Sequence, residues 1–286
     1  MKKIALSIVV ISSSLYGGFV YAGEMGSTIE SNKWTGFYFG GNIGGSWADP
    51  SINVKTVNTF IDPAISENGR TTVPASVIAS SGIIPLHSSG AVGGIQLGYN
   101  YQIATKYLAG FDADIQAIDS HHQSSLTQVA PRIGGTPNTV TVNLAVSQRA
   151  NYIGTVRGRL GMLLPKYNSF LAYFTGGLAY GGIQSSTSIN GGETPITNTT
   201  NFTGSGSFST IRTGYVVGGG LEKFVASKWS AKIEYLYYDL GATNYSNGEL
   251  NSYGHNTGIL RYTNSSSSSI RFNGNIVRVG LSFHFA

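Results

Sequence analysis

The last twelve residues, "NIVRVGLSFHFA" from Asn275 to Ala286, decide the fold. Every odd position from Val277 to Phe285 is apolar, and the even positions between them are Arg278, Gly280, Ser282 and His284. Successive side chains of a β-strand point to opposite faces, so one face of this strand is apolar and the other carries a guanidinium and an imidazole. Such a strand fits either a soluble sheet packed on a core or a barrel whose outside faces lipid.

The composition favours the barrel. Charged residues make up 11% of the 286-residue chain, against roughly a quarter in typical soluble domains. Gly (39), Tyr (17) and Phe (13) are abundant instead, and Cys is absent. No run of 18 apolar residues follows residue 22, which argues against membrane-spanning helices. The formal charge of +5 comes without basic clusters, so nucleic acid is not an expected partner.

The N-terminus has the pattern of an export signal. Lys2 and Lys3 precede an apolar region, Ile4 to Val20, and a small-residue cleavage site ending at Ala22. We therefore predict a cleaved signal peptide at residues 1–22 and one barrel domain at residues 23–286. Cleavage leaves 16 Lys and Arg against 13 Asp and Glu, a mild basic excess.

Alternation of apolar and polar residues predicts eight strands of about ten residues or more, the length of a tilted strand that crosses a bilayer. Their ranges are Phe37–Trp47, Ala91–Tyr101, Tyr107–Ala117, Tyr152–Leu164, Phe170–Ile183, Tyr215–Phe224, Trp229–Tyr238 and the closing segment from Asn275.

The predicted connections alternate in length. Three are short ("QIATK", "PKYNS" and "ASK"), and four are long and rich in Ser, Thr, Asn and Gly, at residues 48–90, 118–150, 185–212 and 240–273. Short periplasmic turns and long outer loops on an even number of strands are typical of outer-membrane barrels. The prediction is an all-β, eight-stranded antiparallel transmembrane β-barrel in a Gram-negative outer membrane, in contact with its lipid.

The same alternation places eight charged side chains inside the barrel. Four are acidic and four are basic, so their charges can balance, and paired charges are tolerated where isolated ones are not. They are Asp112, Asp114, Glu222, Glu234, Arg157, Arg159, Lys232 and Arg278. Since an eight-stranded barrel has room only for side chains, we expect this network to plug the interior.

Aromatic residues near the strand ends suggest membrane-interface girdles. They are Trp34, Trp47, Tyr101, Tyr107, Trp229, Tyr237 and Tyr238.

The chain resembles a family at these strands. The stretches "WTGFYFGGNIGGSW", "GGIQLGYNYQ", "RGRLGM", "YFTGGLAYG", "WSAKIEYLYYDLG" and "VRVGLSFHF" are similar to those of small alphaproteobacterial outer-membrane proteins with an OmpA-like barrel, the opacity-like and porin-like group that includes hemin-binding proteins. The resemblance implies insertion by the barrel-assembly machinery, which recognises a C-terminal strand with a terminal aromatic residue. Here Ala286 follows Phe285, a small departure from that pattern.

Candidate ligands for a cofactor are four histidines in the predicted outer loops: His87, His121, His122 and His255. Histidine can coordinate heme iron, and the resemblance implies hemin for some relatives. Solvated loop histidines are the simpler interpretation, and no other cofactor or metal site is expected. Asp112 and Asp114 resemble an acid–base pair, but structural ion pairing explains them better, so we expect no enzyme.

The sequence therefore predicts a surface barrel that supports envelope integrity and makes surface contacts, including contacts with host molecules, through its loops. Two alternatives are hemin binding and a narrow porin for small solutes.

Overall fold

The computed structural model describes residues 33–132, 138–164, 167–194 and 201–285. The predicted signal peptide at 1–22 lies outside these residues. The elements are β1 (Gly36–Ala48), β2 (Ser51–Ile61), α1 (Glu67–Arg70), α2 (Thr72–Ala79), β3 (Gly82–Pro85), β4 (Ser88–Ala104), β5 (Tyr107–Pro131), β6 (Thr139–Leu164), β7 (Tyr167–Thr194), β8 (Phe202–Phe224), β9 (Trp229–Tyr253) and β10 (Leu260–His284). Within the described part of the chain, neither helix is long and apolar enough to cross a membrane.

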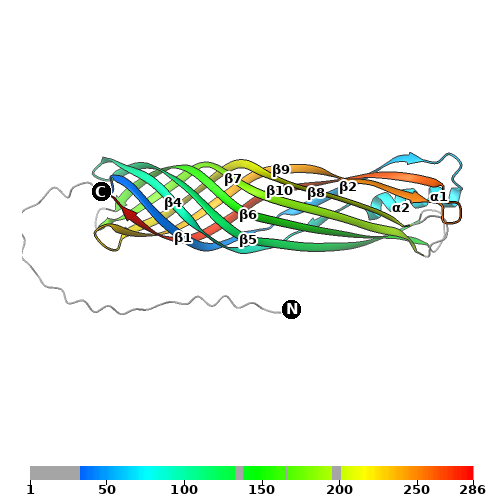
Figure 1. The fold of residues 1–286 in the computed structure, drawn as a ribbon, viewed down its shortest axis with the longest axis horizontal. Helices are drawn as coiled ribbons and strands as arrows, with labels where there is room; N and C mark the ends of the chain where they lie inside the picture. Colours follow the sequence, from blue (N-terminus) through cyan, green and yellow to red (C-terminus); the bar gives the residue numbers. More distant parts are fainter. Residues whose placement is uncertain (1–32, 133–137, 165–166, 195–200, 286) are drawn as a thin grey trace, which may run out of the picture. The chain divides into compact units, whose positions relative to one another are not determined.

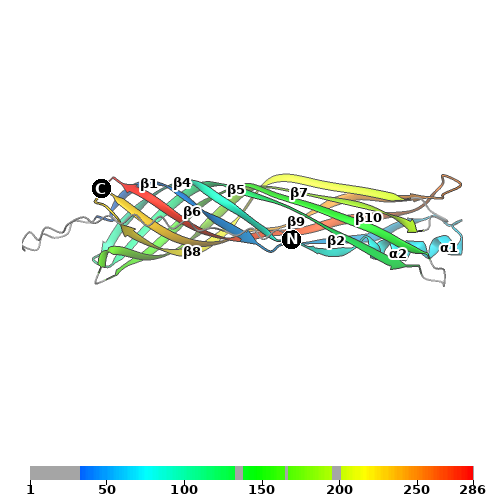
Figure 2. The same cartoon turned by 90° about the horizontal axis from the view of Figure 1, so that it is seen from below.

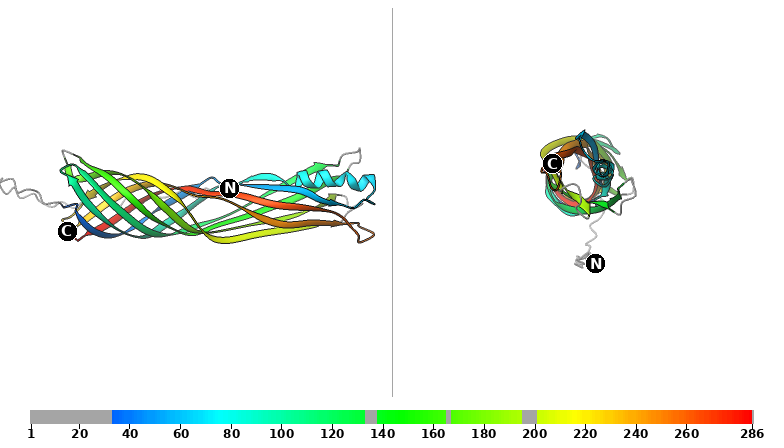
Figure 3. Two further views of the ribbon diagram at one scale, coloured as in Figure 1. Left: turned by 90° about the horizontal axis from the view of Figure 1, so that it is seen from above. Right: turned by 90° about the vertical axis from the view of Figure 1, so that its right-hand side faces the viewer.

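The strands form one antiparallel sheet that closes on itself (Figure 1). Its order is β1-β4-β5-β6-β7-β8-β9-β10-β2-β3, and β1 also pairs with β10, from Tyr38 opposite His284 to Trp47 opposite Asn275. Seen end-on, the strands make a ring (Figure 3). The predicted count of eight strands is not confirmed, because the described residues form a sheet of ten. The additional strands, β2 and β3, arise within the predicted loop 48–90, where β2 pairs with β10 and β3 with β2.

The four long loops were predicted wrongly. Residues 118–150, 185–212 and 240–273 mostly continue the strands, so β5 to β10 contain 23 to 28 residues each. A strand of 25 residues is about 80 Å long, far more than a bilayer requires. Backbone pairing between the arms of a hairpin does not depend on apolar side chains, so segments rich in Ser and Thr remain in the sheet.

An apolar band surrounds the sheet at the end that carries the short connections. Outward-facing residues of this band include Phe39, Ile43, Leu160, Phe174 and Val279, all at least 49% exposed. Side chains this apolar and this exposed are suited to acyl chains. Two residues of the predicted girdle lie inside instead. The Trp34 side chain is 2% exposed and packs against Phe224, with ring centroids 4.5 Å apart, and Tyr238 packs against the interior apolar cluster.

Beyond this band lies a part of the sheet that we term the projecting half (Figure 2). It comprises residues 119–131, 139–149, 184–194, 202–212, 242–253 and 260–271, together with β2, β3, α1 and α2. Here the outward residues are mostly Ser, Thr, Asn and Gln, and the buried ones combine an apolar cluster with hydrogen-bonded polar side chains such as Thr187, Asn247 and Ser268.

On β6, a β-bulge accompanies this inversion of faces. Apart from Gln148, the even positions of this strand from Val140 to Met162 hold apolar residues or glycine. Above the bulge, between Ala150 and Tyr152, the even residues are buried; below it, Val156 and Leu160 point outward and the odd residues point inward. One extra residue in a strand reverses which face its side chains occupy. The same alternation along β6 therefore places polar side chains on the outside in the projecting half and apolar side chains on the outside in the apolar band.

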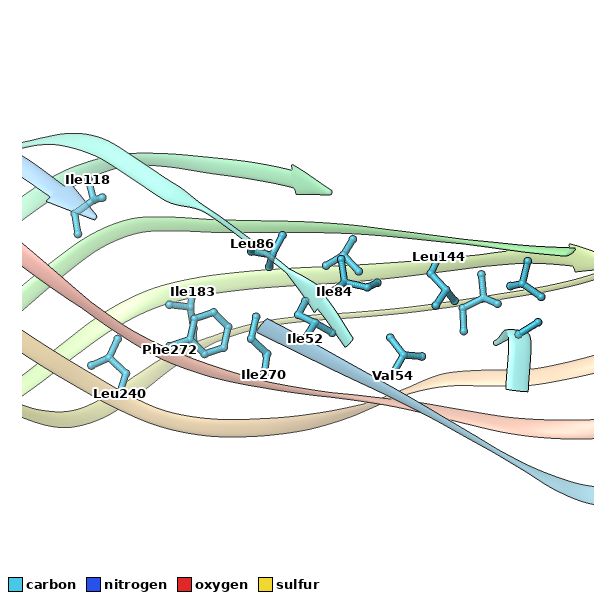
Figure 4. Packing of buried hydrophobic residues seen from close by; sticks show 14 of the residues in the cluster. Ile52, Val54, Ile84, Leu86, Ile118, Leu144, Ile183, Leu240, Ile270 and Phe272 are labelled. Atoms are coloured by element: carbon cyan, nitrogen blue, oxygen red, sulfur yellow. The ribbon is translucent and has the colours of Figure 1, made fainter. Parts of the chain in front are cut away.

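Buried apolar side chains fill much of the projecting half (Figure 4). Ile52, Ile84 and Leu144 pack there with residues of α2, such as Ala75 and Ala79. The α2 helix contacts β2, β5, β6 and β7 and lies within the outline of the ring in the end-on view (Figure 3). A helix therefore fills space that side chains alone do not fill.

Two smaller features complete the filling of the interior. At the end with the short connections, Trp34 packs with Leu108, Leu163, Leu171 and Tyr173. Near the top of the apolar band, a cavity of about 30 Å³ is lined by residues that include Ile118, Ile183 and Phe272. A cavity of this size holds one or two water molecules.

The two environments predict different tolerance for charge on one strand. Val156→Arg, in the apolar band, should reduce the free energy of unfolding by about 2–4 kcal/mol, because an arginine near the bilayer midplane is poorly solvated. Asn143→Arg, outward on the same strand in the projecting half, should change it little. Urea unfolding in lipid vesicles measures both, and equal losses would contradict the assigned boundary.

Candidate functional site

The eight charged residues singled out in the sequence come together inside the apolar band. Asp112 and Asp114 lie on β5, Arg157 and Arg159 on β6, Glu222 on β8, Lys232 and Glu234 on β9, and Arg278 on β10. All eight are buried, with at most 6% of the residue exposed. Five strands thus contribute charge to one interior layer.

Arg157 and Arg278 form the centre of this layer with two carboxylates. The Nη2 atoms of both arginines donate to Asp114 Oδ2 at 2.8 Å. Both also bind Glu234, from Arg157 Nη1 at 3.0 Å and from Arg278 Nε at 2.8 Å. Each carboxylate bridges two guanidinium groups, an arrangement of charge-assisted hydrogen bonds that links β5, β6, β9 and β10.

Arg159 organises a second group beside the first. Its Nη2 donates to Glu222 Oε2 at 2.6 Å, and its Nη1 lies 3.7 Å from Asp112 Oδ2. Glu222 also accepts from Ser230 at 2.6 Å and lies 3.5 Å from His284 Nε2. The imidazole noted in the closing strand thus lies at the edge of the network.

Sequence reasoning missed two tyrosines in this layer. The Tyr38 hydroxyl donates to Asp112 and accepts from Arg159 Nη1 at 3.0 Å, and the Tyr173 hydroxyl donates to Glu234 at 2.9 Å. Glycine makes room for the Tyr38 ring, because a Cβ at Gly98 would lie 2.3 Å from its hydroxyl oxygen. Strand parity places both tyrosines inward and was the signal that could have identified them.

Lys232 differs from the three arginines. Its Nζ is buried and has no hydrogen-bond partner among the described residues, although Lys232 is the register partner of Glu222 and shares a face with Glu234. Its charge completes a balance of four acids and four bases. Uncompensated charge in a low-dielectric interior is very costly, so this balance is what makes the layer tolerable.

The four candidate histidines do not converge. His121 and His122 are neighbours on β5, so their rings lie on opposite faces of the sheet. His87 is exposed and binds Asp49 at 2.8 Å, and His255 lies in the exposed turn between β9 and β10. Among the described residues, no group of three or more His, Cys, Asp or Glu could hold a metal ion.

The two neighbouring histidines also differ in their bonding. His122 Nε2 accepts the backbone N–H of Ser89 at 3.2 Å, which requires an unprotonated nitrogen. Partial burial, and then the neighbouring His121, lower the pKa of His122 and favour that neutral form. His121 is exposed on the outer face, where its Nε2 lies 3.5 Å from the Ser147 hydroxyl. The exposed His121 imidazole lies beside a groove on the outer face of the sheet.

Comparison with known proteins places the sequence among outer-membrane proteins. The model of the outer membrane protein beta-barrel domain matches residues 21–285. The 31 kDa outer-membrane immunogenic protein of Brucella melitensis is 27% identical over 90% of this chain and 86% of its own. The 22 kDa outer membrane protein of Rhizobium leguminosarum is 34% identical over 36% of this chain and 43% of its own.

Among solved structures, the outer membrane protein OprG of Pseudomonas aeruginosa is 12% identical, with a TM-score of 0.35, over 87% of this chain and 97% of its own.

The network predicts a strong asymmetry between two arginines of β10. Arg278→Met should reduce the free energy of unfolding by about 3–5 kcal/mol, because it leaves a buried negative charge uncompensated. Arg271→Met is the matched control, since Arg271 is largely exposed where it pairs with Asp239 and should contribute little. Urea unfolding in vesicles, followed by tryptophan fluorescence, compares them. Equal, small losses would show that the interior charges are solvated.

Proposed function

Because the chain belongs to the outer membrane protein beta-barrel domain family and lies in the Gram-negative outer membrane, we propose that it is a sealed surface barrel that holds the projecting half outside the cell. The predicted resemblance and localisation are thereby confirmed. In this proposal, eight strands, β1 and β4 to β10, cross the membrane with the short connections in the periplasm. The projecting half takes the place of the predicted loops as the surface for contacts, including contacts with host molecules.

The length of β5 to β10 carries this proposal. A bilayer uses about ten residues of each strand, and more than ten further residues stay paired beyond the apolar band. Their exterior is polar, and their interior is filled by apolar side chains together with hydrogen-bonded Ser, Thr and Asn, as expected for a structure in water. The resulting stalk presents hairpin tips away from the membrane. The Brucella relative is described as immunogenic, which agrees with exposure at the surface.

The same geometry supports a role in envelope integrity. The charge network links five strands, and closure between β1 and β10 leaves no strand edge in the bilayer. The C-terminal strand β10, which ends next to Phe285, is the part of the chain that we propose the barrel-assembly machinery recognises.

The porin alternative has less support. The Trp34 cluster, the charge network and the apolar layer that includes Ile183 and Leu240 follow one another inside the sheet. A solute would have to displace side chains that are already paired or packed.

One experiment tests both orientation and sealing. The chain has no cysteine, so Asn190→Cys, in the projecting half, should react with a membrane-impermeant maleimide on intact cells. The matched Leu178→Cys, in the apolar band of the same strand, should not react. The same purified protein should give no stepwise current in planar bilayers. Labelling of Asn190→Cys only in broken cells would show that the projecting half lies in the periplasm. Regular current steps would favour the porin alternative.

Hemin binding is the second candidate, and the exposed His121 imidazole supports it. Arg149, the register partner of His121, could pair with a hemin propionate. Titration of hemin should then give a saturable Soret shift that His121→Ala abolishes and His255→Ala preserves. The absence of any saturable shift would reject hemin as a ligand.

A further inference from the structure

A row of polar residues crosses four strands just beyond the apolar band. His121 on β5 is opposite Arg149 on β6, Arg149 is opposite Gln184 on β7, and Gln184 is opposite Ser209 on β8. All four side chains are exposed on the outer face of the sheet.

The position of this row along the barrel is set by tyrosines. Tyr152, Tyr180 and Tyr215 lie on the outer face of β6, β7 and β8, a few residues below Arg149, Gln184 and Ser209. Tyrosine is enriched where acyl chains meet lipid head groups. The row therefore lies at the height of the head groups.

The row is basic and lacks acidic partners. Arg149 and His121 form no ion pair within the described part of the chain, although the exposed Asp119 lies two residues before His121 on the same face of β5. Two basic side chains directly opposite each other destabilise a sheet when both are charged. An anion between them removes that repulsion, and the planar guanidinium of Arg149 suits the oxygens of a phosphate.

A groove begins at this row and continues away from the membrane. Its first part, about 490 Å³, is lined by His121, Arg149, Gln184 and several serines. Its second part, about 550 Å³, shares Ser147, Ser186 and Ser207 with the first. Further hydroxyl and amide groups line it at Gln123, Ser125, Ser188 and Ser205.

The chemistry of the groove suits a saccharide. Hydroxyl and amide side chains both donate and accept hydrogen bonds, as sugar hydroxyls require of a partner. Neighbouring strands present these groups about 4.8 Å apart. The apolar band directly below offers a surface for acyl chains, so one molecule can contact all three regions.

We propose that this row and groove bind the head group of a phosphorylated glycolipid of the outer leaflet. Arg149 and His121 hold a phosphate, the serine-lined groove holds the adjoining sugars, and the acyl chains lie against β5 to β8. The site rests on the proposed orientation, which cysteine labelling tests separately.

Binding of a labelled lipopolysaccharide to the purified full-length protein in detergent micelles tests the proposal. The probe carries two phosphates on its lipid portion, and a phosphatase-treated sample lacks them. Arg149→Gln should weaken binding of the phosphorylated probe about tenfold, with a similar effect for His121→Gln, and neither should change binding of the treated probe. Arg271→Gln is the matched control, because it removes an exposed arginine of β10 already paired with Asp239.

Three outcomes would overturn the proposal. Equal binding of the two probes by the wild-type protein would show that the site does not recognise the phosphate groups. Equal losses of affinity for Arg149→Gln and Arg271→Gln would show that the effect comes from the change in net charge and not from this site. Displacement of the probe by millimolar inorganic phosphate would assign the site to soluble phosphate rather than to a lipid. Unchanged heat-modified mobility in electrophoresis confirms that each variant is folded.

Discussion

Closure of the sheet by β1 and β10 is the contact on which the rest of the structure depends. Ten register pairs, from Tyr38–His284 to Trp47–Asn275, remove the two edges that an open sheet would expose. Within hydrocarbon, each unpaired backbone N–H or C=O costs several kcal/mol, so an open sheet is not stable there. Closure also gives the sheet an inner and an outer face, and the type of side chain at each position depends on which face it occupies.

Different solvents along one sheet explain the reversal of its faces. In the apolar band, lipid surrounds the barrel, and polar and charged groups are inside, where they pair with one another. In the projecting half, water surrounds the sheet, and Leu144, Ile189 and Leu250 are inside. The bulge near Ala150 on β6 marks this change for one strand. A regular strand would have put valines into water or charges into lipid.

The two halves differ in what they can do. The band is filled by a neutral network and packed aromatic groups, so it is suited to anchoring rather than to transport. The projecting half offers a polar outer surface and hairpin tips, and the groove beside Arg149 begins where the two halves meet. Anchoring and contact are thus separated along one set of strands.

The sequence by itself determined the all-β fold class, the positions of the strand segments in the apolar band and the faces of their side chains, because alternation with a period of two is a local property. The position of each residue on the polar face of its strand was enough to predict all eight charged residues of the interior network. Only the tertiary structure decided that Arg157 binds both Asp114 and Glu234, and that Trp34 lies inside. It also decided that the segments taken for loops are paired strands with a helix inside, since pairing between distant segments and a one-residue bulge leave no local signal.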